Sequence, residues 1–451
     1  MFDYGCGLGD DLRLLEKRGI SCAGWDPVHR PGVEPDAEQH SADLVNLGYV
    51  LNVIETPAER VCTLQRAWKL ARRLLVVSAR LSMEGPGGHD QIYNDGYLTR
   101  IGTFQKYFEQ SELRQLIASS LSRSPVAAGP GVFYVFCDPG EREGFLARRS
   151  RRPSAAPRIC KSELLYEEHK ELLESLIDFV AARGRLPEED ELDAGPAIVA
   201  ALGSLRQAFA VVRRATGRQG WTAIRHARSL DLLVYLALAN FDDRPRFSHL
   251  PRSLQLDIRS FFSSYKAACK KADELLFALG DQSELDRLCR SAGVGKETPS
   301  ALYVHRLALD RLPAELRVYE GCAAAFIGSV EKANIIKLHR KHPAVSYLSY
   351  PTFDRDPHPA LASSLVVHLD GPRARRRDYS GSDNPPILHR KEAFVAADYP
   401  LRDRFERLTR QEERWSLYAC PGEIGTRNGW NALLERYGFC YRGHRMVRTK
   451  G

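Results

Sequence analysis

The sequence lacks the features that would place the protein in a membrane or outside the cell. It contains no uncharged apolar run near the length of about 18 residues that a membrane-spanning helix requires. Its first eleven residues, MFDYGCGLGDD, carry three Asp and no Lys or Arg, whereas a signal peptide begins with positive charge. The ten cysteines form no Cys-x-x-Cys pair. We therefore expect a reduced, cytoplasmic protein with no membrane partner and no structural zinc.

The chain is long enough for several domains, and its patterns change along its length. It has 451 residues, of which 43% are apolar and 27% charged, an ordinary globular composition. Short apolar runs alternate with amphipathic ones at first, helical spacing dominates the middle, and β-branched or aromatic runs follow. These patterns predict an α/β domain over residues 1–138, a linker over 139–160, a helical domain over 161–298 and a basic α+β domain over 299–451.

The net charge of +8 is distributed unevenly. The balance of Lys and Arg over Asp and Glu is −2 for residues 1–150, +4 for residues 151–365 and +6 for residues 366–451. Basic charge thus grows toward the C-terminus. This permits a polyanionic partner, although charged surfaces are usually just solvated.

A glycine-rich motif opens the chain. Residues Asp3 to Gly9 read D-x-G-x-G-x-G at the end of a predicted strand, and residues 10–17 suit a helix. Glycines at such a turn let the backbone approach a ligand closely. Asp26 ends the next predicted strand, seventeen residues after Gly9, where a carboxylate can accept hydrogen bonds from both hydroxyls of a ribose. The alternative is a tight turn without a ligand, in which Asp26 is a cap or turn residue.

The following segment resembles class I S-adenosylmethionine-dependent methyltransferases. Residues 42–57 (ADLVNLGYVLNVIETP) are similar to the family segment D-x-V-x-x-x-x-V-L-x-H-V-x-D-P, and residues 66–80 (RAWKLARRLLVVSAR) resemble the helix and strand that follow it. The resemblance implies a Rossmann-like domain that binds S-adenosyl-L-methionine, with the fourth strand ending beside the methyl group. The residues implied in cofactor binding are Asp3, Tyr4, Gly5, Cys6, Gly7, Gly9, Asp26, Pro27, Asn46 and Leu47.

Two departures from the family pattern lead to further expectations. Only seventeen residues separate Asp26 from Asp43, so the usual second helix and third strand must be much shortened. The chain begins two residues before Asp3, so we expect either a true start upstream of Met1 or an N-terminally shortened first strand. For Asn46, contact with the methionine part and a hydrogen bond to a loop are both open.

The sequence gives weaker signals for the residues that would bind the methyl acceptor. Methyltransferases that act on exocyclic amines often carry N/D-P-P-Y/F after the fourth strand, where this chain reads Asn46-Leu47-Gly48-Tyr49, so the sequence does not favour adenine N6 or cytosine N4 chemistry. A polar loop over residues 83–102 leads to a predicted helix with Thr103 as its N-cap. The substrate candidates on this segment are Asp90, Tyr93, Asp95, Thr103 and Lys106, with capping as the alternative role of Thr103.

Several segments together resemble the family of methyltransferases associated with DNA phosphorothioation. They are Phe2–Gly9, Gly24–Pro27, Asn46–Ile54, Gly102–Phe108, Ile335–His339, Val345–Leu348, Phe353–Asp354, Asp356–Leu361 and Asn384–Glu392. The resemblance covers nearly the whole chain. It implies a DNA modification or defence system, with DNA and the proteins of that system as partners, and leaves the methyl acceptor undefined.

Two basic runs near the C-terminus are candidates for phosphate contacts. Arg376 belongs to the run at 373–377, and His389, Arg390 and Lys391 form the second run. A solvated basic face is the alternative. Asp354, Asp356 and His358 alternate as metal ligands do, but Asp also caps turns readily, so we expect no metal site.

The sequence leaves more than one class of function open. The first hypothesis is an enzyme that transfers a methyl group from S-adenosylmethionine to DNA. The second is a non-catalytic DNA-binding or regulatory subunit that retains the fold, which the shortened first strand and the missing amine motif favour. The third is a methyltransferase that acts on RNA, protein or a small molecule.

Overall fold

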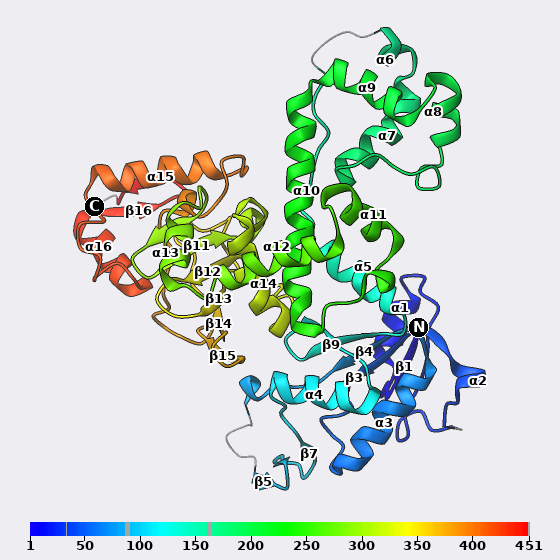
Figure 1. The fold of residues 1–451 in the computed structure, drawn as a ribbon. Coiled ribbons are helices and arrows are strands. Elements are labelled where there is room, and N and C mark those ends of the chain that lie inside the picture. The colour runs from blue at the N-terminus through cyan, green and yellow to red at the C-terminus, as the bar shows by residue number, and fades with distance from the viewer. Residues whose placement is uncertain (33, 86–90, 160–163, 450–451) are drawn as a thin grey trace. The chain divides into compact units, whose positions relative to one another are not determined.

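The chain folds into two compact units (Figure 1). One unit combines Met1–Asp138 with Asp281–Gly451, and the other is Pro139–Gly280. The computed structural model describes residues 1–32, 34–85, 91–159 and 164–449. The first and last parts of the chain therefore belong to the same unit, and the helical part forms its own.

A six-stranded sheet lies at the centre of the N-terminal part. Its strand order is β2-β1-β3-β4-β9-β8. The four strands β1 to β4 are parallel, whereas β9 runs antiparallel to both of its neighbours. The strands are β1 (Phe2–Tyr4), β2 (Ala23–Trp25), β3 (Ala42–Gly48), β4 (Ala71–Ser78), β8 (Val126–Gly129) and β9 (Val132–Phe136). The predicted α/β class is confirmed at this level.

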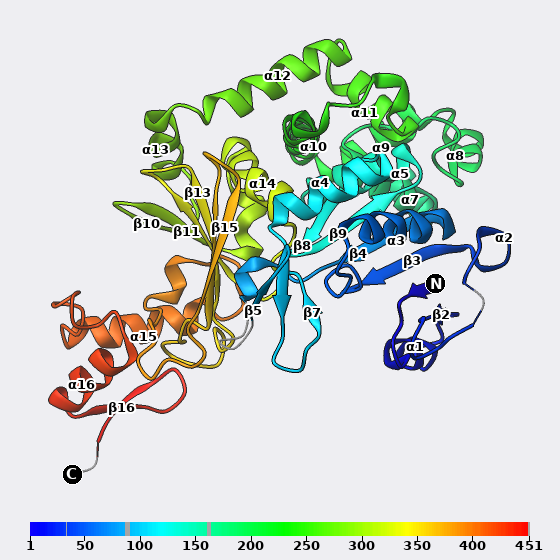
Figure 2. The ribbon, with the colours of Figure 1, turned by 90° about the horizontal axis from the view of Figure 1, so that it is seen from below.

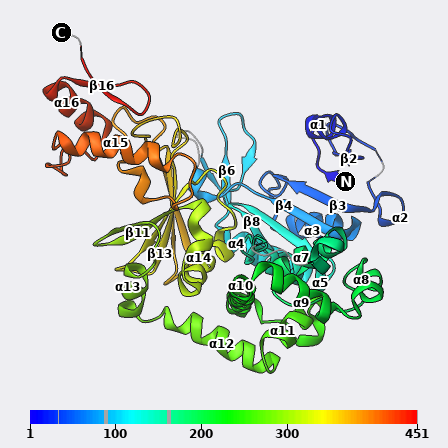
Figure 3. The same ribbon diagram turned by 90° about the horizontal axis from the view of Figure 1, so that it is seen from above.

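Helices cover both faces of this sheet. They are α1 (Asp10–Glu16), α2 (Ala37–His40), α3 (Pro57–Leu70) and α4 (Gln110–Leu121). Figures 2 and 3 show α3 and α4 on one side of β3 and β4, and α1 on the other side. The core includes alternate residues of the central strands, Val45 and Leu47 on β3 and Leu75 and Val77 on β4, because successive side chains of a strand point to opposite faces.

The connection from β2 to β3 is short, as the sequence predicts. Between Asp26 and Ala42, the described residues form only the one-turn helix α2 and an isolated bridge between Asp26 and Arg30. The side chain of Asp36 caps α2 by accepting hydrogen bonds from the backbone N–H groups of the second and third residues after it. As a result, β2 is an edge strand of the sheet.

The segment at Thr103 is a strand, so the prediction of a helix that begins there is wrong. The short strands β5 (Gln91–Tyr93), β6 (Gly96–Leu98) and β7 (Phe104–Gln105) form a small antiparallel sheet. Phe104, Lys106 and Phe108 are buried and alternate with less buried residues. This period of two belongs to a strand, but the sequence conceals it because a lysine occupies the buried face. The helix α4 begins only at Gln110.

The C-terminal part contains a second six-stranded sheet, which is fully antiparallel. Its strands, in sheet order, are β10 (Lys296–Thr298), β11 (Ala301–His305), β12 (Ile335–His339), β13 (Ala344–Ser349), β14 (Ser363–His368) and β15 (Arg373–Asp378). The other elements of this part are α13 (Gln282–Arg290), α14 (Ala314–Ile327), α15 (Arg402–Arg414), α16 (Arg427–Tyr437), β16 (Phe439–Tyr441) and β17 (Met446–Arg448). The strands expected from the β-branched runs near residues 334–338, 345–350 and 364–369 are therefore present as β12, β13 and β14.

The helical unit begins earlier than the sequence predicts. Its helices are α5 (Pro139–Arg149), α6 (Leu164–Glu168), α7 (Lys170–Arg183), α8 (Gly195–Leu202), α9 (Leu205–Thr216), α10 (Arg218–Leu238), α11 (Arg252–Phe261) and α12 (Tyr265–Ala278). Residues 139–149, predicted as linker, form α5, because Pro139 suits a first turn and Glu143 and Ala147 share one buried face. The unit ends at Gly280, and the following α13 belongs to the other unit.

The predicted helix over residues 197–216 is two helices. It breaks at Gly203 and Ser204, and the Ser204 side chain caps α9 by accepting from the backbone N–H of Gln207. In the described part of the chain, no helix by itself has the length and hydropathy to cross a membrane, while α8 and α9, bent by 77°, meet those criteria only as a pair.

One glutamine joins the two sheet-containing parts of the first unit. Gln110 is 3% exposed. Its side chain donates to the backbone oxygen of Phe326 in α14 at 3.0 Å and accepts from the backbone N–H of Gly131 at 2.9 Å. Both backbone groups would lose a partner if this side chain were removed.

We therefore expect Gln110→Ala to lower the free energy of unfolding by about 2–4 kcal/mol, since each unsatisfied buried polar group costs about 1–3 kcal/mol. Urea unfolding followed by circular dichroism measures the change. Gln115→Ala, at an exposed position of the same helix, is the matched control and should change stability by less than about 0.5 kcal/mol. Equal effects of the two substitutions would contradict the assigned role of Gln110.

Candidate functional site

The three glycines of the opening motif form the turn between β1 and α1. Gly5, Gly7 and Gly9 have φ values of 85°, 54° and 77°, in the left-handed region that favours glycine. The backbone N–H of Gly5 donates to the oxygen of Trp25 at 2.7 Å, which fastens the turn to β2. A Cβ on Gly5 would lie 2.4 Å from Cγ2 of Val50, whereas one on Gly7 would have no atom of a described residue within 4 Å apart from its two chain neighbours. The turn is thus closed beside Val50 and open at Gly7.

Asp26 directly follows β2 and holds this turn in place. One carboxylate oxygen accepts from the backbone N–H groups of Val28 at 2.9 Å and His29 at 2.8 Å. The other accepts from the N–H of Gly7 at 3.0 Å. Desolvation by burial raises the pKa of Asp26, but the three backbone hydrogen bonds outweigh it, and the pKa is lowered. A carboxylate has about four acceptor positions, so one remains on the oxygen bound to Gly7.

Asp3 and Asn46 lie side by side where the strand order of the sheet reverses. They are partners in the register of β1 and β3, and Nδ2 of Asn46 donates to Oδ1 of Asp3 at 2.8 Å. Asp3 is 4% exposed. Desolvation raises the pKa of its carboxyl, and the hydrogen bond from Asn46 opposes this rise. Open α/β sheets bind their ligands at the carboxyl ends of the strands beside such a reversal.

The remaining residues predicted to bind the cofactor differ in how far their side chains are exposed. Tyr4 and Leu47 are buried in the core, so neither side chain is accessible to a ligand. The hydroxyl of Tyr4 donates to Glu34 at 3.2 Å, and burial raises the pKa of Tyr4 to about 12. Cys6 is half-buried in the glycine turn, and Pro27 is exposed.

Two residues that the sequence did not single out lie near the same turn. Tyr49 directly follows β3, has a φ of 60° and is 56% exposed. A left-handed φ at a non-glycine residue costs about 1–3 kcal/mol and tends to occur at functional sites. The guanidinium carbon of Arg30 lies 3.1 Å from the position that a Cβ on Gly9 would take. The place of Tyr49 after a predicted strand is a usable sequence signal, whereas nothing in the sequence marks Arg30.

A network of charges holds the loop that follows β4. Asp95 accepts two hydrogen bonds from Arg60, at 2.5 and 2.8 Å. Nζ of Lys106 lies 3.3 Å from Asp95 and 2.8 Å from Glu112. The hydrogen bond from Arg60 is the main cause that lowers the pKa of Asp95 to about 2. Because the side chains of Arg60 and Lys106 are only 3% and 8% exposed, Asp95 and Lys106 serve first to fix the loop.

The other substrate candidates of this loop are more accessible. Tyr93 is 40% exposed, and a hydrogen bond with Glu55 raises its pKa. Thr103 is exposed, and its hydroxyl lies 2.7 Å from that of Thr99. Asp90 lies outside the described residues. Tyr93 and Thr103 are therefore the described candidates that a substrate could reach directly.

The first basic run of the C-terminal part is an exposed edge strand. Arg376 and three further arginines of β15, Arg373, Arg375 and Arg377, are all exposed. β15 ends the second sheet and contacts both α4 and the short helix η1 (Ser82–Glu84). Since η1 follows the carboxyl end of β4, this strand of arginines belongs to the same unit as the glycine turn and contacts the loop region of its sheet.

Lys391, in the second basic run, points into the protein. It is 2% exposed, and its Nζ donates to the backbone oxygen of Phe353 at 2.6 Å and lies 2.7 Å from Nε2 of His444. Desolvation lowers the pKa of Lys391 to about 7. Its ammonium also lies 4.0 Å from the ring centroid of Phe405. A phosphate contact is not available to this side chain.

The two residues before Lys391 differ from it and from each other. His389 lies 2.6 Å from the backbone oxygen of Ile424, and desolvation lowers its pKa to about 3, so it is neutral at pH 7. Arg390 has a φ of 56°, lies over the ring of Tyr418 and is 39% exposed, with Nη1 3.1 Å from Glu413. Of this run, only Arg390 is accessible to a polyanion.

The alternating Asp354 and His358 take part in internal hydrogen bonds. Oδ1 of Asp354 accepts from the hydroxyl of Tyr399 at 2.7 Å. Nε2 of His358 lies 2.7 Å from Glu412, which is fully buried and also accepts from the hydroxyl of Tyr441 at 2.6 Å. In the parts of the chain that the structure describes, no group of three or more His, Cys, Asp or Glu side chains is placed to hold a metal ion.

The ion pairs of Asp95 lead to a prediction about how the stability of the protein depends on pH. The pKa of Asp95 is about 2 in the folded protein, below the value of about 3.9 in an unfolded chain. A carboxyl whose pKa falls on folding stabilises the protein above its unfolded pKa and loses that contribution as the pH falls through the folded pKa. We therefore expect Asp95→Asn to be less stable than the wild type at pH 7, with the difference shrinking between about pH 5 and pH 2.

Urea unfolding at a series of pH values measures this difference. The control is Asp43→Asn, which makes the same chemical change at an exposed position of β3. A difference between wild type and Asp95→Asn that stays constant over this pH range would contradict the network.

The structure thus brings Asp3, Gly5, Gly7, Asp26 and Asn46 together at one edge of the sheet, with the arginines of β15 in the same unit. No protein-family model matches the chain, and no curated protein matches it.

Proposed function

We propose that this protein is an S-adenosylmethionine-dependent methyltransferase. The observation that carries the proposal is the left-handed glycine turn after β1, joined to a carboxylate after β2 through the hydrogen bond from Gly7 to Asp26. A carboxylate at this place suits the ribose of a nucleoside ligand. The similarity of residues 42–57 to class I methyltransferases separates a methyl donor from a dinucleotide and supports the proposal.

The residues at the turn fit the adenosine part of this cofactor. The space at Gly7 allows close approach of a ligand, since no described residue beyond its two chain neighbours would come within 4 Å of a Cβ there. Three of the four acceptor positions of Asp26 are occupied by backbone N–H groups. Asp26 can therefore accept from one ribose hydroxyl, rather than from both as the sequence alone suggests.

The neighbouring strands fit the amino-acid part. Asp3 and Asn46 place a carboxylate and an amide at the end of β1 and on β3. Asp3 is only 4% exposed, so its carboxylate would act on the positive charge of the methionine part through the electrostatic field at the strand ends rather than by direct contact. When bound, S-adenosylmethionine supplies an electrophilic methyl group on its sulfonium. The chain must align the acceptor with that methyl group and exclude water.

We further propose that DNA is the acceptor. Four exposed arginines on one edge strand are suited to phosphate contacts, which depend on positively charged side chains with defined positions. Their contact with η1 brings them to the loop region of the cofactor domain. Charges also protect an edge strand from pairing with other chains. The resemblance to the DNA phosphorothioation family adds support for DNA and is the basis for proposing proteins of such a system as partners.

The first test concerns Asp26. Asp26→Asn keeps the shape of the side chain but removes its charge and presents an N–H group where an acceptor is needed. We expect the Kd for S-adenosylmethionine, measured by isothermal titration calorimetry, to rise about 10–100-fold, because a hydrogen bond to a charged group contributes about 1.5–3 kcal/mol.

The matched control for this substitution is Asp36→Asn. Asp36 also accepts from two backbone N–H groups and is exposed, but it caps α2 rather than the glycine turn. Its substitution should leave the Kd within about twofold, a change of less than about 0.5 kcal/mol. A wild-type chain that is folded and shows no heat of binding, or equal losses in both variants, would count against the cofactor site.

The second test concerns the arginines of β15. Arg375 and Arg376 are exposed on β15, so their substitution leaves the buried core of the fold unchanged. We expect the double variant Arg375→Gln, Arg376→Gln to bind duplex DNA more weakly and to reduce the slope of log K against log salt by about two. Fluorescence anisotropy over a salt series measures both quantities.

The control is the double variant Arg206→Gln, Arg218→Gln, which removes the same charge from exposed positions of the helical unit. It should leave the salt slope unchanged. If both double variants reduce the slope equally, the contact is nonspecific and β15 is not the DNA-binding strand.

One observation favours the second candidate function, a DNA-binding or regulatory subunit without catalysis. Among the described residues, the sheet has no strand beyond β2, which is its edge strand. Transfer of a labelled methyl group from S-adenosylmethionine to plain and phosphorothioated DNA separates the two functions. Incorporation of label excludes a purely regulatory subunit, and its absence with intact cofactor binding would favour one.

A further inference from the structure

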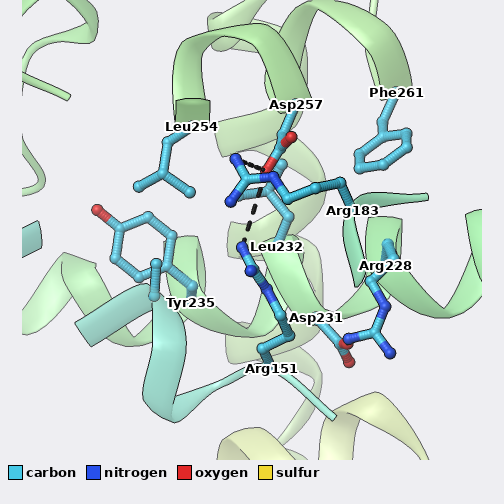
Figure 4. Close-up of a pocket in the computed structure, with 10 residues that line it drawn as sticks. Arg151, Arg183, Arg228, Asp231, Leu232, Tyr235, Leu254, Asp257 and Phe261 are labelled. Carbon is cyan, nitrogen blue, oxygen red and sulfur yellow. Dashed lines mark hydrogen bonds and ion pairs between the residues drawn. The ribbon is translucent and has the colours of Figure 1, made fainter. Parts of the chain in front are cut away.

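The helical unit contains a cavity with an unusual density of arginine (Figure 4). The space within it is about 300 Å³ including its open mouth. Its walls come from the end of α5 and the chain after it, the end of α7, and the facing sides of α10 and α11. The charged lining residues are Arg151, Arg183, Arg228, Asp231 and Asp257, and apolar side chains such as Leu232, Leu254 and Phe261 complete the wall.

Three arginines share the single carboxylate of Asp257. Nε of Arg185 lies 2.7 Å from Oδ1 of Asp257, and Nη2 of Arg183 lies 2.8 Å from Oδ2. Nη2 of Arg151 lies 4.0 Å from the same Oδ2, too far for a hydrogen bond. Figure 4 shows the guanidinium groups of Arg151 and Arg183 both directed toward Asp257. Arg185 has a second carboxylate, Glu191, which it binds at 2.6 and 2.7 Å.

Arg183 has hydrogen-bond donors that this arrangement does not satisfy. Its Nε and Nη2 are buried, and neither makes a hydrogen bond of acceptable geometry within the described residues, although Nη2 is at ion-pair distance from Asp257. Desolvation lowers the pKa of both Arg151 and Arg183, which means that their charge is poorly compensated where they lie. Buried donors without acceptors are rare in folded proteins, so these guanidinium groups favour an anionic partner that supplies acceptor oxygens.

We propose that this cavity binds a phosphate group, either as free inorganic phosphate or as the terminal phosphate of a small molecule. A tetrahedral oxyanion offers several acceptor oxygens and would compensate the charge that Arg151 and Arg183 cannot share through one carboxylate. Arginine is suited to this task because its planar guanidinium binds oxyanions through two parallel hydrogen bonds. This inference does not depend on the proposed methyltransferase function, since all the residues belong to the helical unit.

The size of the cavity limits the ligand. The enclosed part of this cavity is far smaller than the about 300–1,000 Å³ of pockets that enclose a whole drug-sized molecule, because most of its space is the open mouth. The side chain of Arg151 is 27% exposed and that of Arg183 is 15% exposed, so Arg151 lies nearer to solvent. A phosphate group between these two arginines would therefore lie at the open mouth, and any attached group would extend past Arg151 toward solvent.

The test is whether the full-length chain binds sodium phosphate at constant ionic strength. Isothermal titration calorimetry measures the Kd, and thermal unfolding measures the rise in the midpoint temperature that phosphate causes. We expect saturable binding that sodium chloride does not reproduce. Arg151→Gln should raise the Kd for phosphate at least about tenfold, since it removes a charge-assisted contact. This substitution breaks no side-chain hydrogen bond, because the nearest carboxylate oxygen is 4.0 Å away, so the fold should persist.

Two further variants separate a specific role of Arg151 from a general effect of positive charge. Arg206→Gln removes the same charge from an exposed position of α9 and should change the Kd less than about twofold. Arg151→Lys keeps the charge without the planar fork and should bind phosphate with intermediate affinity. The proposal is overturned if chloride stabilises the protein as much as phosphate does, or if Arg151→Gln and Arg206→Gln have the same Kd.

Competition identifies the source of the phosphate group. If deoxyadenosine 5′-monophosphate displaces inorganic phosphate and binds more weakly to Arg151→Gln than to the wild type, the ligand is the terminal phosphate of a small molecule. Binding of inorganic phosphate alone indicates the free ion. Absence of binding by both probes would exclude the site.

Discussion

The hydrogen bond from the N–H of Gly7 to Asp26 is the interaction on which the candidate site depends. It joins the turn after β1 to the end of β2, two strands of three residues each. Strands this short contribute few ladder hydrogen bonds, so the turn needs side-chain anchors. A carboxylate is suited to this role because it only accepts hydrogen bonds and keeps a position free after binding three backbone donors. The same group thereby shapes the turn and offers an acceptor to a ligand.

Many charged side chains of this protein are buried. The net charge of a segment therefore does not show which part of its surface is basic. Arg60, Lys391 and Glu412 are almost fully buried and hydrogen-bonded. Buried ionic groups of this kind tolerate loss of a partner poorly. They therefore behave as parts of the framework, and the arginines of β15 are the clearest accessible basic cluster in the described C-terminal part. The arginines around Asp257 differ from both groups because they outnumber the carboxylate that they share.

Local patterns in the sequence predicted the glycine turn, the parallel strands beside it and the strands β12 to β14, because short-range sterics and hydrophobic periodicity decide these features. The strand at Phe104 was missed because Lys106 occupies its buried face, and α5 was missed because its arginines and proline resemble a linker. Lys391 could not be placed from the sequence, since its partners Phe353 and His444 are brought to it by the tertiary fold. The free acceptor position of Asp26 likewise depends on backbone donors that only the folded turn presents.

A crystal structure of the protein with S-adenosylhomocysteine, the demethylated form of the cofactor, would show directly whether the glycine turn and Asp26 bind the cofactor. We expect the ligand to lie along the glycine turn, with one ribose hydroxyl hydrogen-bonded to the Asp26 oxygen that also binds Gly7, and with its amino-acid part toward Asp3 and Asn46. A ligand bound elsewhere on the protein, or a ribose that makes no contact with Asp26, would contradict it.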